Sequence, residues 1–203
     1  VIRWGIGMDS VDLDAAREFG VSVRNTPGVF ANEVADAAFG YILNLARGFV
    51  GVDAAVRRGE WPKYEGVTLA GNRLGIVGIG AIGHEIARRA TGFGMEVSAC
   101  DPFVTSAPMG VSIVDLTTLL STSRFIVLAC PLTPETFHLI DAGRLALVRA
   151  DSYLINVARG PVVREADLID ALMAGRLRGA ALDVFETEPL PTDSGLRSLP
   201  SVI

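Results

Sequence analysis

The chain has 203 residues, of which 50% are hydrophobic, so it holds enough apolar material for a buried core. Its formal net charge is −5 and its Lys and Arg form no cluster, which argues against nucleic acid as a partner. No apolar run reaches membrane-spanning length, which argues against a membrane protein. The two cysteines, Cys100 and Cys130, are too few for a disulfide framework, so we expect a cytoplasmic protein.

The first residues predict a small α/β segment. Residues 1–6 are typical of a short strand, and because Val1 already lies inside this apolar run we expect the chain to begin partway through a longer protein. Asp12 can cap a helix over residues 12–19, and residues 21–24 predict a second short strand. Pro27 and Gly28 then break the pattern, which places a boundary near residues 28–32.

A long helix follows this boundary, with Asn32 as its expected cap. Apolar side chains recur there at helical spacing, at Val34, Ala38, Tyr41, Ile42 and Leu45. We expect the helical segment to reach Arg58 with a break near residues 48–51.

Strands and helices alternate from residue 74 onward. The pattern predicts strands at residues 74–77, 96–100, 125–129, 153–157 and 180–184, and helices at residues 81–93, 116–120, 141–148 and 165–174. This alternation predicts an α/β fold with a doubly wound parallel sheet, a Rossmann-type domain over residues 29–203. Residues 201–203 resemble the start of a further strand, so we expect the domain to be truncated at its C-terminus.

A glycine-rich loop, Gly78-Ile79-Gly80-Ala81-Ile82-Gly83, lies between the strand at residues 74–77 and the helix at residues 81–93. In this context a GxGxxG motif binds a dinucleotide. Gly78 permits the tight turn, Gly80 leaves room for the pyrophosphate, and Gly83 lets the helix pack closely on the strand. The free N–H groups at the start of the helix would attract the phosphates.

Asp101 lies 18 positions after Gly83 (101 − 83), at the end of the next strand, where a dinucleotide site places the acidic residue that binds the adenosine ribose. Its charge would repel a 2′-phosphate and no Arg directly follows it, so the sequence favours NAD over NADP. Two alternatives stay open here: a glycine-rich turn without a ligand, and an S-adenosylmethionine-binding fold. The strand–loop–helix context argues against the first, and the full six-residue spacing against the second.

Together with this loop, five further stretches resemble motifs of the D-isomer-specific 2-hydroxyacid dehydrogenase family, which includes phosphoglycerate dehydrogenase and glyoxylate or hydroxypyruvate reductases. These stretches are Gly5-Ile6-Gly7-Met8-Asp9-Ser10-Val11-Asp12-Leu13, Asn25-Thr26-Pro27-Gly28, Pro131-Leu132-Thr133-Pro134-Glu135-Thr136, Ile155-Asn156-Val157-Ala158-Arg159-Gly160 and Asp183-Val184-Phe185-Glu186-Thr187-Glu188-Pro189. The resemblance implies that residues 1–28 are the remnant of a smaller flavodoxin-like substrate domain. It also implies hydride transfer between NAD and a D-2-hydroxy acid or 2-keto acid.

The resemblance assigns roles to particular residues. Arg159 matches the arginine that binds substrate, and Glu188 matches the glutamate that raises the pKa of the catalytic histidine. The backbone at Ile6 and Gly7 matches the cradle of the substrate carboxylate. Cofactor contacts are implied at Gly78, Gly80, Ala81, Ile82, Gly83, Asp101, Cys130, Pro131, Val157, Ala158, Arg159 and Asp183, the last near the nicotinamide carboxamide, and no metal is expected.

The chain departs from the family pattern in three places. The family's histidine motif would follow Ile203, and His84 and His138 match no catalytic position, so both are expected to be structural or surface residues. We therefore expect the 203-residue chain alone to bind NAD with little or no turnover. Arg164 stands where an acidic helix cap is usual, and Ala31 stands where many members have Ser or Thr.

Three functions fit these observations. The first is the NAD-dependent oxidoreductase, with a small 2-hydroxy or 2-keto acid as substrate. For this enzyme the resemblance implies a homodimer formed through the long helix from Asn32, whose apolar face fits that interface but could equally pack within the chain. The second is an NAD(H)-binding, dehydrogenase-like regulatory module without turnover, against which Arg159 and Glu188 argue only in part. The third is an NAD-using hydrolase of the adenosylhomocysteinase type, against which the run at residues 156–160 argues. The sequence does not identify which acid is used.

Overall fold

A computed structural model describes residues 1–104 and 108–203. In this part of the chain, a large sheet of six strands has the order β5-β4-β3-β6-β7-β8, and every pair in it is parallel. Within this sheet the chain passes first through β3 near the middle and then through β4 and β5 to one edge. It returns through β6 and continues through β7 and β8 to the other edge. This is the strand order of dinucleotide-binding folds, so the predicted doubly wound sheet is confirmed.

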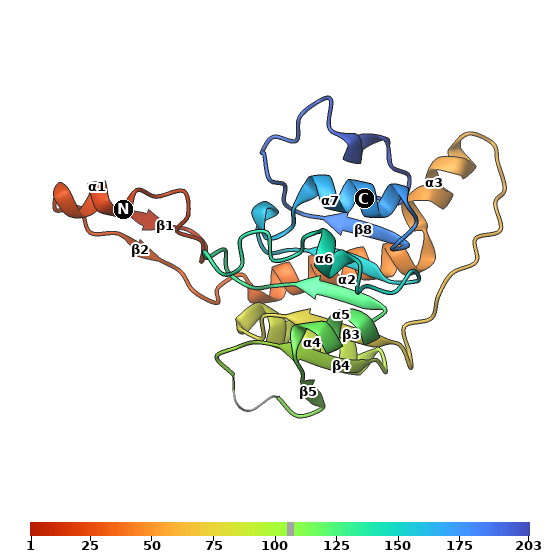
Figure 1. Cartoon of the computed structure of the whole chain (residues 1–203), viewed down its shortest axis with the longest axis horizontal. Helices are drawn as coiled ribbons and strands as arrows, with labels where there is room; N and C mark the ends of the chain where they lie inside the picture. Colours follow the sequence, from red (N-terminus) through yellow and green to blue (C-terminus); the bar gives the residue numbers. More distant parts are fainter. Residues whose placement is uncertain (105–107) are drawn as a thin grey trace.

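Figure 1 shows how the strands and helices follow one another, with a long connection over residues 58–72 between α3 and β3. The large sheet contains β3 (Arg73–Val77), β4 (Glu96–Cys100), β5 (Val111–Ile113), β6 (Phe125–Leu128), β7 (Tyr153–Asn156) and β8 (Gly179–Leu182). The helices are α1 (Leu13–Glu18), α2 (Ala31–Arg47), α3 (Phe49–Arg57), α4 (Ala81–Gly92), α5 (Leu116–Thr122), α6 (Ala142–Leu145) and α7 (Glu165–Met173). The described residues also form two short 3-10 helices, Gly160–Val162 and Gly195–Ser198.

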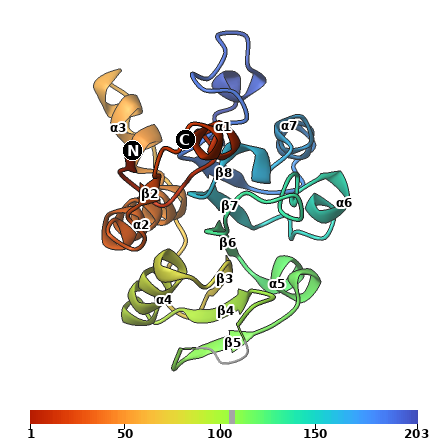
Figure 2. The ribbon, with the colours of Figure 1, turned by 90° about the vertical axis from the view of Figure 1, so that its left-hand side faces the viewer.

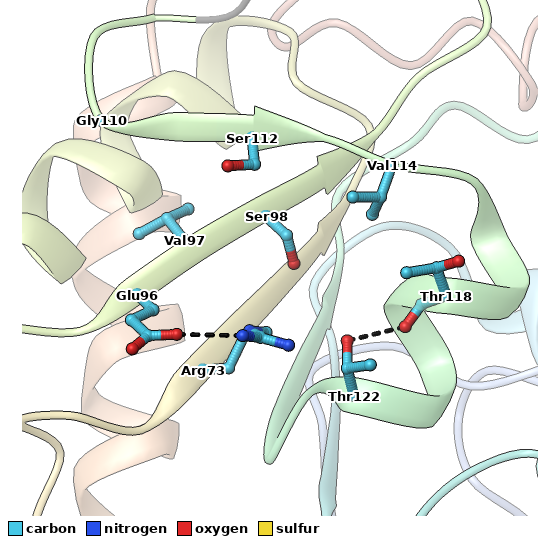
Figure 3. A pocket seen from close by; sticks show the side chains of 9 residues that line it. All are labelled: Arg73, Glu96, Val97, Ser98, Gly110, Ser112, Val114, Thr118 and Thr122. Atoms are coloured by element: carbon cyan, nitrogen blue, oxygen red, sulfur yellow. Dashed lines mark hydrogen bonds and ion pairs between the residues drawn. The ribbon is translucent and has the colours of Figure 1, made fainter.

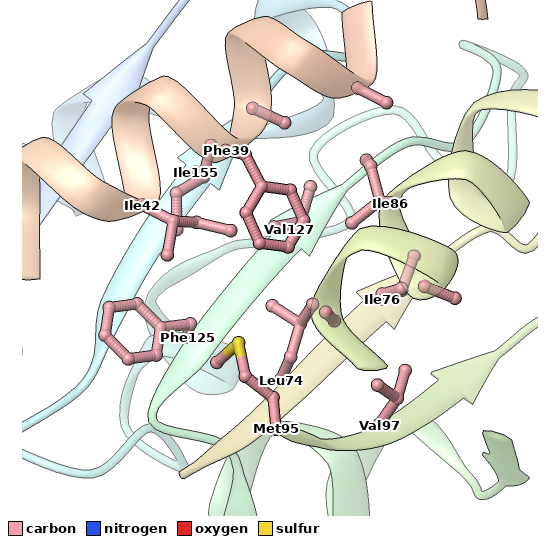
Figure 4. Packing of buried hydrophobic residues seen from close by; sticks show 14 of the residues in the cluster. Phe39, Ile42, Leu74, Ile76, Ile86, Met95, Val97, Phe125, Val127 and Ile155 are labelled. Carbon is pink, nitrogen blue, oxygen red and sulfur yellow. The ribbon is translucent and has the colours of Figure 1, made fainter. Parts of the chain in front are cut away.

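Helices cover both faces of the large sheet, with α2 and α4 on one face and α5, α6 and α7 on the other (Figure 2). The central strands are therefore buried on both faces, which explains their continuous apolar sequences. On the first face, Phe39 and Ile42 of α2 and Ile86 of α4 pack over strand residues such as Leu74 and Val127 (Figure 4). This packing holds the carboxyl ends of β3, β4, β6, β7 and β8 in fixed positions relative to one another.

The N-terminal segment forms a separate two-stranded parallel sheet of β1 (Ile2–Arg3) and β2 (Arg24–Asn25). Both strands are shorter than the predicted runs at residues 1–6 and 21–24, and the second is displaced toward the boundary. Each of these strands has only one neighbour, and side chains such as Ile2 are exposed, so burial stabilises the strands little. Pairing is therefore limited to fewer residues than the apolar runs of the sequence contain.

The start of α2 differs from the prediction. Phe30, not Asn32, is the N-cap, and it provides no side-chain hydrogen bond. Asn32 lies within the first turn, where its side-chain oxygen accepts from Arg89 of α4 at 3.2 Å. The predicted break is confirmed at Gly48, which has a left-handed conformation with φ 65°. The apolar face of α2 packs against the sheet, which corresponds to the internal alternative of the two predicted for it.

Two further features concern the sheet edges. The edge strand β5 was not predicted, because three residues are too few to establish a period. At the other edge, Val202 forms a parallel bridge with Ala180, so the predicted start of a strand at residues 201–203 does pair with β8. Within the described residues no single helix is long and apolar enough to cross a membrane, and α2 with α3 would reach that length only as a pair bent by 62°.

Candidate functional site

The three glycines of the loop between β3 and α4 have three different surroundings. Gly78 has φ 92°, and a Cβ on it would lie 2.8 Å from the Cα atom of Cys130. A Cβ on Gly83 would overlap the carbonyl oxygen of Gly78. A Cβ on Gly80 would meet nothing within 4 Å. Two glycines are thus required by close backbone packing, whereas the third borders open space of the kind that a pyrophosphate would fill.

The first turn of α4 faces this space with free donors. Gly80 is the N-cap and, having no side chain, forms no capping hydrogen bond. The N–H groups of Ala81, Ile82 and Gly83 therefore find no capping side chain. Free donors and the helix dipole together favour an anion, so the loop fits the phosphates of NAD.

Asp101 lies directly after β4 and bonds the glycine loop. Its Oδ2 atom accepts from the backbone N–H of Ile79 at 3.0 Å, and its Oδ1 atom accepts from that of Phe103 at 2.9 Å. A carboxylate has about four acceptor sites, so both oxygens can still accept from ribose hydroxyls. The nearby Arg88 and Arg89 pair with Glu85, and Arg89 also pairs with Asp36, which leaves neither free to attract a 2′-phosphate.

Cys130 and Pro131 follow β6 and lie against the opposite side of the glycine loop. The backbone of Cys130 is what a side chain on Gly78 would meet. Burial raises the pKa of the Cys130 thiol to about 11, so this wall of the site is uncharged at neutral pH. Thr136 holds the loop after Pro131, because its hydroxyl donates to the Pro131 carbonyl at 2.6 Å.

The turn after β7 presents Arg159 at the same edge of the sheet. Val157 and Ala158 are buried, and the side chain of Asn156 spans the turn. Its Nδ2 donates to the Arg159 carbonyl and its Oδ1 accepts from the Ala158 N–H, each at 3.0 Å. Asn156 therefore fixes the backbone from which the guanidinium of Arg159 projects.

The guanidinium of Arg159 contacts the N-terminal segment. Its Nε donates to both carboxylate oxygens of Asp9 at 3.2 Å, and its Nη1 donates to the Ala158 carbonyl at 2.6 Å. Its Nη2 lies so close to Gly7 that a side chain at that position would collide with it. The structure thus brings together Arg159 and Gly7, two residues that the resemblance assigns to substrate, and Ile6 is the chain neighbour of Gly7.

The loop after β8 packs against the turn that carries Arg159. A Cβ on Gly160 would overlap the carbonyl of Phe185, so only glycine permits this contact. Glu188, in the same loop, accepts from the Phe185 N–H through Oε1 at 3.0 Å. Asp183, at the start of the loop, accepts from the hydroxyl of Tyr41 through Oδ1 at 2.6 Å. Arg159, Asp183 and Glu188 therefore belong to one group of contacting turns.

Neither histidine bonds Glu188. His138 lies within hydrogen-bond distance of Glu186 at 2.6 Å and accepts from Arg164 at 3.3 Å, and the Nδ1 of His84 lies 3.0 Å from the Gly80 carbonyl. Arg164 occupies the N-cap position of α7 and provides no side-chain hydrogen bond, as expected for an arginine that stands where an acidic cap is usual. Glu165 and Asp167 in the first turn of α7 offset the cation near the positive end of that helix.

Sequence reasoning did not single out Asp9, Tyr41 or Asn156 as parts of the site. Asp9 and Asn156 lie inside stretches that carry the resemblance, so their position was indicated but their contacts were not. Tyr41 counted only as one apolar position of a helix. Its hydroxyl acquires a partner only when α2 is laid against the end of β8.

A separate hollow of about 460 Å³ lies near the start of β3 and β4 (Figure 3). Arg73, Glu96 and several hydroxyl side chains line it, but none of the predicted site residues does. Because ligands of open α/β sheets bind at the carboxyl ends of the strands, this hollow is not the cofactor site. No group of His, Cys, Asp or Glu that could hold a metal ion occurs among residues 1–104 and 108–203.

Comparison with known proteins agrees with this geometry. The family model for the D-isomer specific 2-hydroxyacid dehydrogenase, NAD binding domain, matches residues 39–203. The glyoxylate reductase of Thermococcus litoralis is 43% identical over 201 residues, which are 93% of this chain and 61% of that protein. The D-3-phosphoglycerate dehydrogenase of Methanocaldococcus jannaschii is 40% identical over 207 residues, which are 99% of this chain and 39% of that protein.

A solved structure gives the same result. The NAD-dependent formate dehydrogenase from Staphylococcus aureus in complex with NAD has a TM-score of 0.90 and 32% identity, covering all of this chain (100%) and 63% of its own. The chain spans only 39% to 61% of the length of the two curated relatives named above. The cofactor is NAD, and the chain belongs to the D-isomer specific 2-hydroxyacid dehydrogenase family, of which it carries the NAD-binding domain.

Proposed function

We propose that the protein containing this chain transfers a hydride between NAD and carbon 2 of a small D-2-hydroxy acid or 2-keto acid. Residues 1–28 would be the end of its substrate domain and residues 29–203 its NAD-binding domain. The observation that carries the proposal is the contact of Arg159 with Gly7. It joins a cation at the end of β7 to a backbone segment outside the large sheet, at the sheet edge that also carries the glycine loop.

NAD supplies the hydride donor and acceptor when it is bound. The N–H groups at the start of α4 would hold its phosphates, and Asp101 would accept from the ribose hydroxyls. Cys130 and Pro131 would line the adenosine side, with Val157 and Ala158 behind the middle of the cofactor. Asp183 would accept from the carboxamide of the nicotinamide.

Arg159 would orient the substrate and polarise it. A guanidinium is planar and always charged, so it can donate in parallel to a carboxylate and a carbonyl oxygen. Positive charge beside the carbonyl oxygen stabilises the negative charge that develops there during reduction. Glu188 would hold the proton-donating imidazole of the family, since a carboxylate bonded to an imidazole raises its pKa.

The proposed substrates are small 2-keto acids such as glyoxylate and hydroxypyruvate. The first gives its name to the glyoxylate reductase of Thermococcus litoralis, and the second to the hydroxypyruvate reductase of Thermotoga maritima, which is 40% identical to this chain over 204 residues. The narrow contact between Arg159 and Gly7 suits a short acid, because the guanidinium already lies against the backbone there.

A test begins with NADH titration by fluorescence, followed by addition of oxamate, an unreactive analogue of a 2-keto acid. Arg159→Gln should abolish oxamate binding to the NADH complex, measured at NADH concentrations that saturate each variant. Arg57→Gln, which breaks an exposed ion pair with Asp53, is the matched control and should leave oxamate binding unchanged. Oxamate binding that survives Arg159→Gln would contradict the proposal.

Turnover is then measured as NADH consumption by the complete polypeptide with glyoxylate and hydroxypyruvate. Oxidation with either acid, lost in Arg159→Gln, supports the oxidoreductase. A protein that binds NADH through the glycine loop but consumes it with no 2-keto acid would instead be the regulatory module. The regulatory alternative has no structural observation of its own in its favour.

We also propose a homodimer, because α3 leaves Phe49, Val50 and Val56 exposed, and Trp61, which follows α3 in the chain, is exposed as well. This patch, rather than the apolar face of α2, is what a second copy would cover, since the α2 face is already buried against the sheet. Light scattering on the purified protein should give twice the mass of the chain. Val50→Asp should shift it to the single-chain mass.

A further inference from the structure

The hydrogen bond between Tyr41 and Asp183 joins two segments that are 142 positions apart. Tyr41 lies on α2, and Asp183 directly follows β8 at the carboxyl edge of the sheet. The hydroxyl donates to the Oδ1 atom of Asp183 at 2.6 Å. The ring of Tyr41 packs on the hydrophobic core beneath α2, so the hydroxyl is delivered from a rigid element.

We call this hydrogen bond between Tyr41 and Asp183 the clamp, and its donor persists at neutral pH. Burial and the neighbouring Asp183 raise the pKa of Tyr41 to about 12, so the phenol stays protonated and remains a donor at neutral pH. A hydrogen bond to an ionised acceptor is stronger than one between neutral groups. The backbone of Asp183 is held as well, since its N–H donates to the Asn156 carbonyl at 3.0 Å.

One carboxylate oxygen of Asp183 remains available. In residues 1–104 and 108–203 no group donates a hydrogen bond to Oδ2. Without the Tyr41 hydroxyl, this exposed side chain could rotate among its rotamers. With it, the rotamer that bonds Tyr41 is favoured, and Oδ2 keeps the orientation of that rotamer.

We propose that Tyr41 is a positioning residue for NAD, acting through Asp183 so that one carboxylate oxygen is kept ready for the N–H donors of the nicotinamide carboxamide. The inference rests on the proposed function, because it takes Asp183 as a contact of the nicotinamide. It extends that function by assigning specificity for the nicotinamide end of the cofactor to a side chain of α2.

The hydroxyl and the ring of Tyr41 can be separated experimentally. Tyr41→Phe keeps the ring and its packing and removes only the donor. Tyr64→Phe is the matched control, because the Tyr64 hydroxyl donates to the Leu45 carbonyl of the same helix and contacts no site residue. Each variant is titrated with NADH and with ADP-ribose, which contains the adenosine, phosphates and ribose but lacks the nicotinamide. Thermal melting records the stability of each variant.

Tyr41→Phe should weaken NADH binding about 10-fold, the factor that 1.4 kcal/mol represents, and leave ADP-ribose binding unchanged. Tyr64→Phe should change neither. In an Asp183→Ala background the same Tyr41→Phe change should have no further effect on NADH, since the group through which Tyr41 acts is gone. A structural role alone would not distinguish the two ligands.

The outcomes separate this inference from the function on which it rests. If Asp183→Ala weakens NADH but Tyr41→Phe does not, the clamp is overturned and the assignment of Asp183 stands. If Asp183→Ala leaves NADH binding unchanged, the nicotinamide contact in the proposed function fails, and the clamp fails with it. If Tyr41→Phe weakens NADH and ADP-ribose equally, the hydroxyl supports the fold and the inference is overturned.

Discussion

Gly80 and Gly83 lie three positions apart in one loop, yet their surroundings predict opposite results for the same substitution. A methyl group on Gly83 overlaps the carbonyl oxygen of Gly78, a backbone atom that cannot rotate away. A methyl group on Gly80 meets no atom within 4 Å, and its φ of −69° suits alanine. Gly83→Ala should therefore damage the fold, whereas Gly80→Ala should damage cofactor binding alone.

The magnitudes follow from these contacts. Overpacking at Gly83 should cost about 1–3 kcal/mol, offset in part by about 0.4–1 kcal/mol because alanine restricts the unfolded chain. For a chain of this size, 1 kcal/mol shifts the melting temperature by roughly 2–4 °C, so Gly83→Ala should lower it by several degrees. Gly80→Ala gains the same restriction, which offsets the roughly 0.5–1 kcal/mol by which an N-cap prefers glycine to alanine, so its melting temperature should change little.

The assay is a thermal melt of each variant without ligand, followed by NADH titration at a temperature at which both are folded. Gly80→Ala should bind NADH about 10-fold or more weakly, which corresponds to at least 1.4 kcal/mol, because the methyl group occupies the space of the pyrophosphate. Wild-type affinity in Gly80→Ala would refute the placement of the phosphates. A wild-type melting temperature in Gly83→Ala would refute the packing argument.

Three further predictions concern charged and titratable groups of the site. Asp9→Asn should weaken oxamate binding to the NADH complex about 2- to 5-fold, because the ion pair that orients the Arg159 guanidinium is lost and partly exposed pairs contribute up to roughly 1 kcal/mol. Equal affinities of the variant and the wild type in calorimetry would contradict this. Asp101→Ala should narrow the preference for NADH over NADPH, measured by titration with each; an unchanged ratio would argue against its contact with the ribose. Burial raises the pKa of the Cys130 thiol from 9.0 to about 11. Between about pH 9 and about pH 11 the unfolded chain therefore loses a proton that the folded chain keeps. The free energy of unfolding should fall as the pH rises through this window. Denaturant titrations across this window should show about 2–3 kcal/mol less decline in Cys130→Ala than in the wild type, and parallel slopes would exclude the mechanism.

Much of the architecture follows from local sequence patterns. Central strands such as β6 and β7 are buried on both faces, so they appear as continuous apolar runs bounded by polar turns. The glycine loop was recognised because the chemistry of a tight turn before a helix needs glycine at fixed spacing. Asp12 was identified correctly as a cap because its side chain bonds the backbone only two and three residues ahead.

The errors occurred where neighbours in space outweigh local preference. Asn32 has the chemistry of a cap, but its oxygen bonds Arg89 on another helix, and the N-cap of α2 is Phe30, two residues earlier. β5 is an edge strand of three residues, formed because β4 offers it hydrogen bonds. Neither outcome is encoded in a window of a few residues.

The arrangement of the site arises at a still longer range. Parallel strands bring their carboxyl ends to one edge, so Asp101, Arg159 and Asp183 could be assigned to that edge from their positions after strands. The partners that orient them could not. Arg159 meets Asp9 across 150 positions and Asp183 meets Tyr41 across 142, and these pairs exist only because helices and segments are laid against the finished sheet. The spacing of residues along the chain indicates which strand each one follows. The direction in which a carboxylate or guanidinium points depends on contacts between segments that are far apart in the sequence.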